Sequence, residues 1–326
     1  MEIIDNYDKY QKSYILDKRD FKILNAICDN ARMSYSKIGK LTYISKDRVR
    51  ERIKRLENEK FILSYIPLIN YRVLGYSIYY IYLKINNLPE YFKDFVKHLI
   101  GKEEVISLTK IIGKYDLEIK LIIKRKEDLN KFIRSLKKDK SKIIKEIGIL
   151  HSKSLDFFSM RMQSSYFKNK IANLRNYLQP IEIDNKDKKI LNMLSKNARE
   201  SFVEISKKIN VKFDVVRYKI KNLIKNGVIL GFFSRTNKHR LGLNSYILLL
   251  NLKKELDEKD ISKLKNMLNI YYLERITGRW NFIIHFYARG NKGLVETLDT
   301  IRRTFNDSLL NLDLLILLER FKPIPF

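Results

Sequence analysis

Cysteine, histidine, glycine and proline are all scarce in this sequence of 326 residues, which contains 1 Cys, 4 His, 11 Gly and 5 Pro. The single cysteine, Cys28, excludes an internal disulfide. The histidines are isolated from one another at positions 98, 151, 239 and 285, so a structural zinc site is not expected. Few glycines and prolines beside 45% hydrophobic residues exclude collagen-like, low-complexity and wholly disordered chains. The composition therefore predicts a globular protein without a bound metal.

Long apolar runs are missing as well. Apolar runs such as residues 246–250 and 314–318 are far shorter than the roughly 20 residues of a membrane-spanning helix. The N-terminus carries Glu2 and Asp5 where a secretory signal has basic residues, and no apolar run follows. We therefore expect a cytoplasmic protein without a membrane segment.

The common enzyme motifs do not occur either. The sequence has no Walker phosphate loop, no G-x-G-x-x-G and no G-x-S-x-G. We therefore expect a protein that is not an enzyme and that holds no cofactor.

Positive charge is abundant: 66 Lys and Arg against 37 Asp and Glu give a formal net charge of +29. Such an excess favours a polyanionic partner, with nucleic acid before an acidic membrane surface. AT-rich codon usage would also enrich Lys, Ile, Asn and Tyr without selection for binding. The position of the charge along the chain decides between these explanations.

The chain repeats itself after 167 residues. This shift aligns residues 16–62 with residues 183–229 without a gap, and 19 of the 47 pairs are identical. Gly113 meets Gly278 at a shift of 165. A fixed internal period indicates a duplicated structural unit. The chain is thus a tandem duplication of one two-part unit.

The first part of each unit has the apolar spacing of short helices. In repeat 1, Asp17 or Asp20 caps the first helix, Ser34 caps the second and the third begins at Ser45. Three short helices, the last of them basic, are typical of a helix-turn-helix. Residues 61–62 and 228–229 then open a strand that continues as a wing.

The second part alternates strands and helices in the order βαββαβ, which predicts a ferredoxin-like sheet with two helices on one face. In repeat 1 the expected strands are 76–85, 105–112, 117–123 and 143–150, and the expected helices are 90–100 and 128–137. In repeat 2 the expected strands are 243–252, 271–277, 282–288 and 312–318, and the expected helices are 260–268 and 294–305.

The sequence therefore predicts an α+β protein of two repeats, each a winged helix-turn-helix followed by a ferredoxin-like domain. The expected segments are an N-terminal segment and helix-turn-helix at 1–66, a ligand or oligomerisation domain at 67–155, a linker at 156–182, a second helix-turn-helix at 183–234 and a second ligand or oligomerisation domain at 235–326.

These residues resemble the Lrp/AsnC (feast/famine) family of transcription regulators. The resemblance is carried by residues 16–24, 30–32, 38–41 and 51–62, and by Gly113-Lys-Tyr-Asp116, which looks like the Gly-x-x-Asp turn of the family's ligand domain. It implies a sequence-specific regulator of double-stranded DNA, modulated by a small effector such as an amino acid. The family's usual subunit has one unit, whereas this chain has two, and the second lacks the Glu-Arg-x-x-Arg pattern of the first.

The third helix of repeat 1 has the charge of a DNA-reading helix. Residues 45–56 hold six bases and two acids, and Val49 marks the centre of the buried face. Long cations reach phosphates, and an arginine also grips guanine through two hydrogen bonds. We therefore expect Arg48 to read a base and Lys46, Arg50 and Arg55 to contact phosphates.

The third helix of repeat 2 is the weaker reader. Residues 212–223 hold four bases and one acid, and Val215 and Tyr218 lie on the outward face, where they contact either DNA or the linker. The predicted DNA-binding residues of both helices are Ser45, Lys46, Arg48, Arg50, Lys54, Arg55, Lys212, Arg217, Tyr218 and Lys221.

Gly113 and Asp116, with Gly278 and Asn281 in repeat 2, are the candidates for effector binding. Such a glycine turn places a carboxylate against an amino group, and an ordinary hairpin turn uses the same residues. Because neutral Asn281 does not balance an ammonium group, at most one of the two pockets is expected to bind an amino acid in the family's manner.

Two alternative functions and two assembly states remain open. Siroheme decarboxylases share the two-part build, and residues 237–242 with His239 and Arg240 are loosely similar to a stretch of those enzymes, in whose chemistry a basic third helix has no evident role. A chromatin-like protein that coats DNA without sequence preference would also carry a charge of +29. The duplication allows a pseudo-dimer within one chain or a homo-oligomer.

Overall fold

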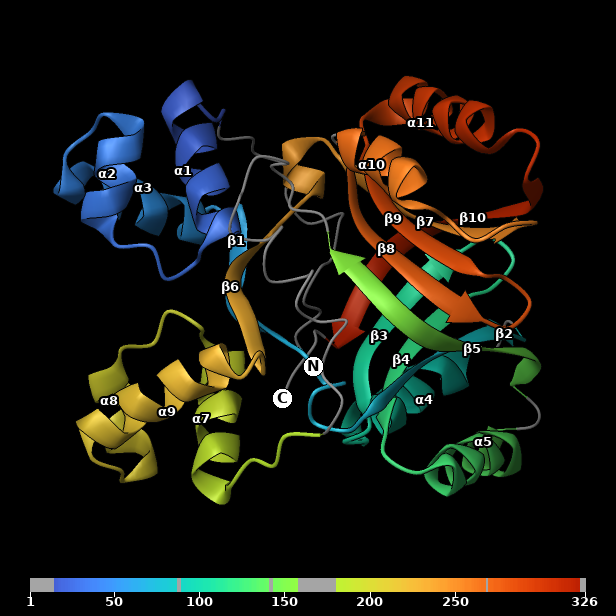
Figure 1. Ribbon diagram of the computed structural model, residues 1–326, viewed down its shortest axis with the longest axis horizontal. Helices are drawn as coiled ribbons and strands as arrows, with labels where there is room; N and C mark the ends of the chain where they lie inside the picture. The colour runs from blue at the N-terminus through green and yellow to red at the C-terminus, as the bar shows by residue number, and fades with distance from the viewer. Residues whose placement is uncertain (1–14, 87–88, 141–142, 158–179, 268, 323–326) are drawn as a thin grey trace. The chain divides into compact units, whose positions relative to one another are not determined.

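The computed structural model describes residues 15–86, 89–140, 143–157, 180–267 and 269–322. These residues form two compact units, and each unit takes one part from each repeat (Figure 1). We call residues 15–74 and 180–241 the helix-turn-helix unit. The described residues of 75–157 and 242–322 form the sheet unit. Most of the predicted linker lies outside the described residues.

The helix-turn-helix unit contains two three-helix groups, each followed by a strand. Repeat 1 supplies α1 (Lys18–Asp29), α2 (Tyr35–Thr42), α3 (Lys46–Asn58) and β1 (Ile62–Ile69). Repeat 2 supplies α7 (Asn185–Lys196), α8 (Phe202–Ile209), α9 (Phe213–Lys225) and β6 (Ile229–Thr236).

The helix caps of repeat 1 lie where the sequence predicts them. Asp17 caps α1 and exchanges hydrogen bonds with Asp20 in a capping box. The hydroxyls of Ser34 and Ser45 accept from the backbone of the first turns of α2 and α3. Helices of this length are marginal in water by themselves, so these caps and the packing that follows decide where each helix begins.

A two-stranded antiparallel sheet of β1 and β6 joins the two groups (Figure 1). Reciprocal hydrogen bonds also cross between them: the Ala31 N–H donates to the Phe232 carbonyl at 2.8 Å, and the Ala198 N–H donates to the Tyr65 carbonyl at 2.9 Å. Ala31 matches Ala198 and Tyr65 matches Phe232 in the repeat alignment. The two groups are therefore related by a pseudo-two-fold axis, and the wings are the joint between them.

The sheet unit contains two ferredoxin-like βαββαβ domains, which confirms the predicted fold class. Repeat 1 supplies β2 (Ser77–Ile85), α4 (Pro89–Gly101), β3 (Val105–Ile112), β4 (Leu117–Ile123), α5 (Lys126–Lys140) and β5 (Ile144–Phe157). Repeat 2 supplies β7 (Asn244–Leu252), α10 (Glu258–Asn266), β8 (Ile270–Thr277), β9 (Phe282–Ala288), α11 (Gly290–Phe305) and β10 (Leu309–Lys322).

The edge strands of the two domains pair with each other. β3 pairs with β10 and β5 with β8, so the eight strands close in the order β10-β3-β4-β2-β5-β8-β9-β7. An unpaired edge is a template for association with another chain, and this closure leaves none among the described strands of the sheet unit. The pseudo-dimer expected within one chain is thus the arrangement of the sheet unit.

Alternate residues of each strand face two different cores. The outer faces pack under helices, with α4 and α5 over repeat 1 and α10 and α11 over repeat 2 (Figure 1). The inner faces meet in a core that both repeats share, which includes Tyr82 and Tyr115 of repeat 1 and Trp280 and Leu315 of repeat 2.

Pairing between repeats also explains where the predicted boundaries were wrong. The predicted strand 143–150 is β5, which continues to Phe157 because its second half pairs with β8. The predicted strand 312–318 is β10, which continues to Lys322 because it pairs with β3. The segment boundaries after residues 66 and 234 fall inside β1 and β6, since these strands pair across their whole length.

Gly113 lies in the turn between β3 and β4, and Gly278 lies in the turn between β8 and β9. Each turn packs against a strand of the other repeat. Their φ angles are 139° and 149°, a region that side chains disfavour. A Cβ on Gly113 would lie 2.8 Å from the carbonyl oxygen of Leu314, and one on Gly278 would lie 3.0 Å from that of Ile149. Ile149 and Leu314 occupy equivalent positions on β5 and β10, so both glycines permit close packing between repeats.

Replacing Gly113 by alanine is expected to lower the free energy of unfolding by about 1–3 kcal/mol, from backbone strain and overpacking together. Gly101→Ala is the control, because its Cβ would meet no atom within 4 Å and its φ is not positive. Urea unfolding of both variants measures the difference. Equal stability of the two variants would contradict this role of Gly113.

Because each domain finds its partner in the same chain, we expect a monomer in solution. Light scattering at micromolar concentration should give a mass near 39.0 kDa. A stable mass of twice that value would show that chains associate through a further surface.

Candidate nucleic-acid interface

Helix α3 presents an apolar face to the core and a charged face to solvent. Val49, Ile53 and Leu56 are buried, as the sequence predicts. The exposed charged side chains are Lys46, Asp47, Arg48, Arg50, Glu51 and Lys54. Ser45, which accepts the Arg48 N–H at 3.3 Å, fixes the start of the helix. The first turns of α3 therefore project cations outward, as a helix that enters a major groove requires.

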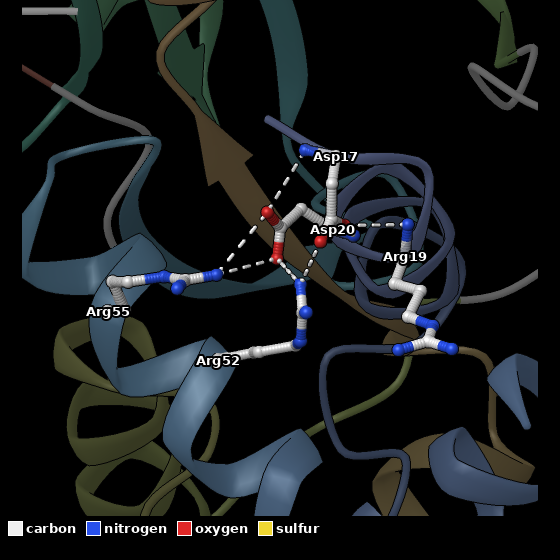
Figure 2. Close-up of polar contacts among 5 residues, drawn as sticks. All are labelled: Asp17, Arg19, Asp20, Arg52 and Arg55. Atoms are coloured by element: carbon white, nitrogen blue, oxygen red, sulfur yellow. Dashed lines mark hydrogen bonds and ion pairs between the residues drawn. The ribbon is translucent and has the colours of Figure 1, made fainter. Parts of the chain in front are cut away.

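Two arginines of α3 are tied to α1 rather than wholly free for DNA (Figure 2). Arg52 Nη1 lies 2.7 Å from both Asp17 Oδ2 and Asp20 Oδ1, and Arg55 Nη2 lies 3.2 Å from Asp20 Oδ1. Asp20 is fully buried, so these cations balance a charge that burial would otherwise penalise. The Arg52 side chain is 16% exposed and that of Arg55 is 41% exposed. A phosphate contact by Arg55 stays a prediction, and it would have to be shared with Asp20.

Helix α9 is anchored at the same place by a different residue. Lys219 Nζ lies 2.7 Å from Asp184 Oδ2 and 3.1 Å from Asp187 Oδ1. Lys219 matches Arg52, and the two aspartates match Asp17 and Asp20. The hydrogen bond from Lys219 lowers the pKa of Asp184 to about 2. The anchor is therefore preserved where the family's sequence pattern is lost.

The exposed faces of α3 and α9 agree at some matched positions and differ at others. Both helices carry an exposed cation at Arg50/Arg217 and at Lys54/Lys221. They differ in chemistry at Lys46/Phe213, Arg48/Val215 and Glu51/Tyr218. Tyr218 is 64% exposed, so its ring is not buried against the described part of the chain. Lys212, at the N-cap of α9, is exposed and makes no side-chain cap hydrogen bond.

A pair of arginines fastens the two helix-turn-helix groups together. Arg32 Nη1 donates to the carbonyls of Ala198 at 2.6 Å and Glu200 at 3.0 Å, and Arg199 Nη1 donates to the carbonyl of Ala31 at 2.5 Å. Each guanidinium also lies over two aromatic rings, Phe202 and Phe232 for Arg32 and Tyr35 and Tyr65 for Arg199. Burial, and then the charge of Arg199, lower the pKa of Arg32 to about 10. We call this pair the arginine clasp.

The clasp carries a stability prediction. Arg32→Met keeps much of the side-chain volume but leaves two carbonyls without their donor, which is expected to cost about 1–3 kcal/mol of unfolding free energy. The matched control is Arg19→Met on the exposed surface of α1, where Figure 2 shows the guanidinium directed away from the aspartates. Chemical unfolding followed by circular dichroism compares the two. A control as unstable as Arg32→Met would rule out the clasp as the cause.

The predicted effector residues already have structural partners. Asp116 accepts from the Ile85 N–H at 2.8 Å and from Lys84 Nζ at 3.0 Å. Asn281 accepts from the Leu252 N–H at 3.0 Å and donates to the Leu252 carbonyl at 2.7 Å. Ile85 and Leu252 end the matched strands β2 and β7, so both side chains hold the ends of these strands. Together with the two glycines, they shape the hairpins.

The stretch that is loosely similar to siroheme decarboxylases belongs to the helix-turn-helix unit. His239 and Arg240 lie in a short 3₁₀ helix, His239–Leu241. The Arg240 guanidinium lies 4.8 Å from the centre of the Phe61 ring, and its Nη2 lies 3.5 Å from Glu59 Oε2. Its side chain is thus used for packing within this unit.

Sequence reasoning missed the clasp. The identical Asn-Ala-Arg at 30–32 and 197–199 was the available signal, because an arginine retained in both repeats beside a helix end needs a partner. Within the described ranges no cluster of His, Cys, Asp and Glu is placed to hold a metal ion. None of the described helices is long and apolar enough to cross a membrane.

Comparison with known families gives the same reading of both helical groups. A model of winged helix-turn-helix DNA-binding domains matches residues 16–62 and again residues 183–229. The chain is 34% identical over 119 residues to the HTH-type transcriptional regulator Ptr1 of Methanocaldococcus jannaschii, which covers 36% of this chain and 80% of that protein. It is 28% identical over 120 residues to the regulator FL11 of Pyrococcus furiosus, covering 36% of this chain and 78% of FL11.

Solved structures of a siroheme decarboxylase match both repeats of the chain. The siroheme decarboxylase NirDL aligns with a TM-score of 0.63 over 95% of this chain and 94% of that chain, at 14% sequence identity. At this identity the likeness shows a shared fold and nothing about chemistry.

Proposed function

The chain belongs to the Lrp/AsnC family of helix-turn-helix transcription regulators, and from this we propose that it regulates transcription as a single-chain pseudo-dimer that reads double-stranded DNA. Helices α3 and α9 each enter a major groove of the same duplex. Their half-sites form an imperfect inverted repeat, because operator symmetry mirrors the symmetry of the protein.

One observation carries this proposal: two cationic reading helices belong to one unit, joined by β1, β6 and the arginine clasp. A regulator of the usual kind needs two identical chains to present two such helices. Here one chain presents both, so the second helix is delivered to its half-site at the effective concentration of an intramolecular reaction.

The internal repeat separates positioning residues from reading residues. Phosphates are the same at every site, so cations that bind them are kept at both copies, as Arg50 and Arg217 are. Base readers follow the sequence of their own half-site and therefore differ between copies. On this basis Arg48 reads one half-site through a guanine, and Tyr218 with Val215 contacts the other through a thymine methyl or sugar.

We propose further that the chain acts without catalysis and that a small molecule modulates it. Major-groove recognition requires no reacting group, and the family implies an effector. A ligand at Asp116 would have to displace Lys84 or the Ile85 N–H, both of which this carboxylate already binds. We therefore do not place the effector at the glycine turns.

Phosphate contacts predict a steep dependence on salt. The logarithm of the affinity should fall linearly with the logarithm of salt concentration, with a slope of about 0.9 per phosphate contact. Arg50→Ala should weaken binding to all DNA sequences alike and reduce this slope. Fluorescence anisotropy across a salt series measures both. An affinity that does not change with salt would refute the proposed interface.

Base reading predicts a selective loss. Arg48→Ala should cost about 1–3 kcal/mol at one base position and little on random DNA, because it removes the hydrogen bonds to a single base. Tyr218→Ala should remove the preference for particular bases in the other half-site. It should leave the base preference in the half-site read by Arg48 unchanged. Footprinting on substituted operators decides this. Uniform protection of all DNA would instead favour a non-specific coating protein.

A further inference from the structure

The interior of the closed sheet has an apolar half and a polar half. The apolar half holds Trp280, Tyr115 and the aliphatic side chains near the two glycine turns. The polar half holds buried side chains from both repeats, among them Thr109, Glu118, Lys120, Ser152, Glu274 and His285. Their strand neighbours Leu108, Ile119, Ile284 and Phe286 pack under the helices, so strand alternation directs this set inward.

The fold does not require a polar group at every one of these positions, and the two repeats of the chain provide the comparison. The shifts that align the two repeats match Glu118 with Ile283 and Ser152 with Leu317. The same shifts match Tyr80 with Ile247 and Tyr82 with Leu249. At these four positions one repeat places apolar side chains where the other places polar ones, whereas Lys120 matches His285 and Thr109 matches Glu274, so those positions are polar in both repeats. Burying carboxylates and lysine is costly relative to apolar packing, which points to a role beyond architecture.

Most of the polar half is paired within itself. The Tyr82 hydroxyl donates to Glu118 Oε2 at 3.0 Å, and the hydroxyls of Tyr80, Tyr272 and Ser152 donate to Glu274. Lys120 donates to the Tyr272 hydroxyl and lies 3.6 Å from Glu274 Oε2. The network holds its members in fixed positions, as preorganised sites require.

Two buried atoms in this half retain unused hydrogen-bonding capacity. His285 Nε2 and Thr109 Oγ1 have no hydrogen-bond partner among the described residues. His285 is 6% exposed and Thr109 is 0% exposed. Burial, together with the charges of Lys120 and Arg320, lowers the pKa of the His285 imidazole, while burial raises the pKa of the Glu118 carboxyl. The charged groups that lower the pKa of the imidazole, Lys120 and Arg320, are both cations.

We propose that this interior is a binding site for a small carboxylate anion, hydrogen-bonded to His285 Nε2 and Thr109 Oγ1 and stabilised by the positive charge of Lys120 and Arg320. A neutral imidazole donates through one nitrogen, and a hydroxyl donates as well, so the two groups suit the two oxygens of one carboxylate. Both groups are buried among the side chains of the sheet unit, so the ligand that we propose is a small aliphatic acid. As the location of the effector, the site rests on the proposed function, whereas binding itself does not.

The test uses the full chain without DNA, with acetate and pyruvate as probes. Spectra of ¹⁵N-labelled histidine should show a saturable shift of the His285 ring nitrogens with either carboxylate, and none with chloride at equal ionic strength. No shift with either carboxylate, as when only water occupies the interior, would overturn the proposal. An equal shift with chloride would overturn it too, because it would indicate non-specific anion binding.

Variants then locate the site. Thr109→Val, which is isosteric, should weaken carboxylate binding about tenfold, as expected for one hydrogen bond to a charged group. Its thermal midpoint without ligand should not fall, since its hydroxyl has no partner to lose; a marked fall would indicate a structural threonine and contradict the site. Carboxylate should raise the thermal midpoint of the parent protein, and His285→Phe should abolish this increase. His98→Asn, on the exposed face of α4, is the control and should bind as the parent does.

DNA binding is measured separately. Without carboxylate, His285→Phe should bind the operator with the parent's affinity, because the substitution lies in the sheet unit. A chain that binds carboxylate but no DNA would refute the proposed function and leave this site standing. A chain that binds DNA but no carboxylate would refute this site and leave the proposed function standing.

Discussion

Within each of the two units, strands from repeat 1 pair edge to edge with strands from repeat 2, and this pairing holds the unit together. β1 pairs with β6, β3 with β10 and β5 with β8. Each pairing meets a row of backbone donors and acceptors that would otherwise attract another chain. The added length of β5 and β10, the positive φ of Gly113 and the reciprocal bonds of the arginine clasp all depend on it. The duplication thus places both sides of each pairing in one chain.

Local patterns were sufficient to predict the elements and the fold class. Caps such as Ser34 and Ser45 and the spacing of apolar residues act within one or two turns, so they can be read from neighbouring residues. The partners of Arg32 could not be read this way, because Ala198 and Glu200 lie in the other repeat. Arg55 illustrates the same limit: its outward position followed from the helical period, and its bond to buried Asp20 required the tertiary packing of α1.

Repeat 2 has lost parts of the family's sequence pattern but keeps the interactions made at two of these positions. In sequence, repeat 2 departs from the family pattern at Lys219. Its ammonium group nevertheless binds the same two aspartate positions that Arg52 binds in repeat 1. Asn281 likewise replaces an acid and still binds the end of its strand. Both substitutions keep the bond that the fold needs. On the outward faces of α3 and α9, by contrast, Lys46/Phe213, Arg48/Val215 and Glu51/Tyr218 differ in chemistry.

In the complex that we propose, the difference between α3 and α9 gives the bound protein a direction. A dimer of identical chains can be rotated about its symmetry axis and placed back on the operator with no change. In this chain the same rotation would bring Tyr218 to the position of Glu51 and Val215 to that of Arg48. In this proposed complex the protein has two distinct ends along the duplex, and a promoter on one side meets a different surface from a promoter on the other.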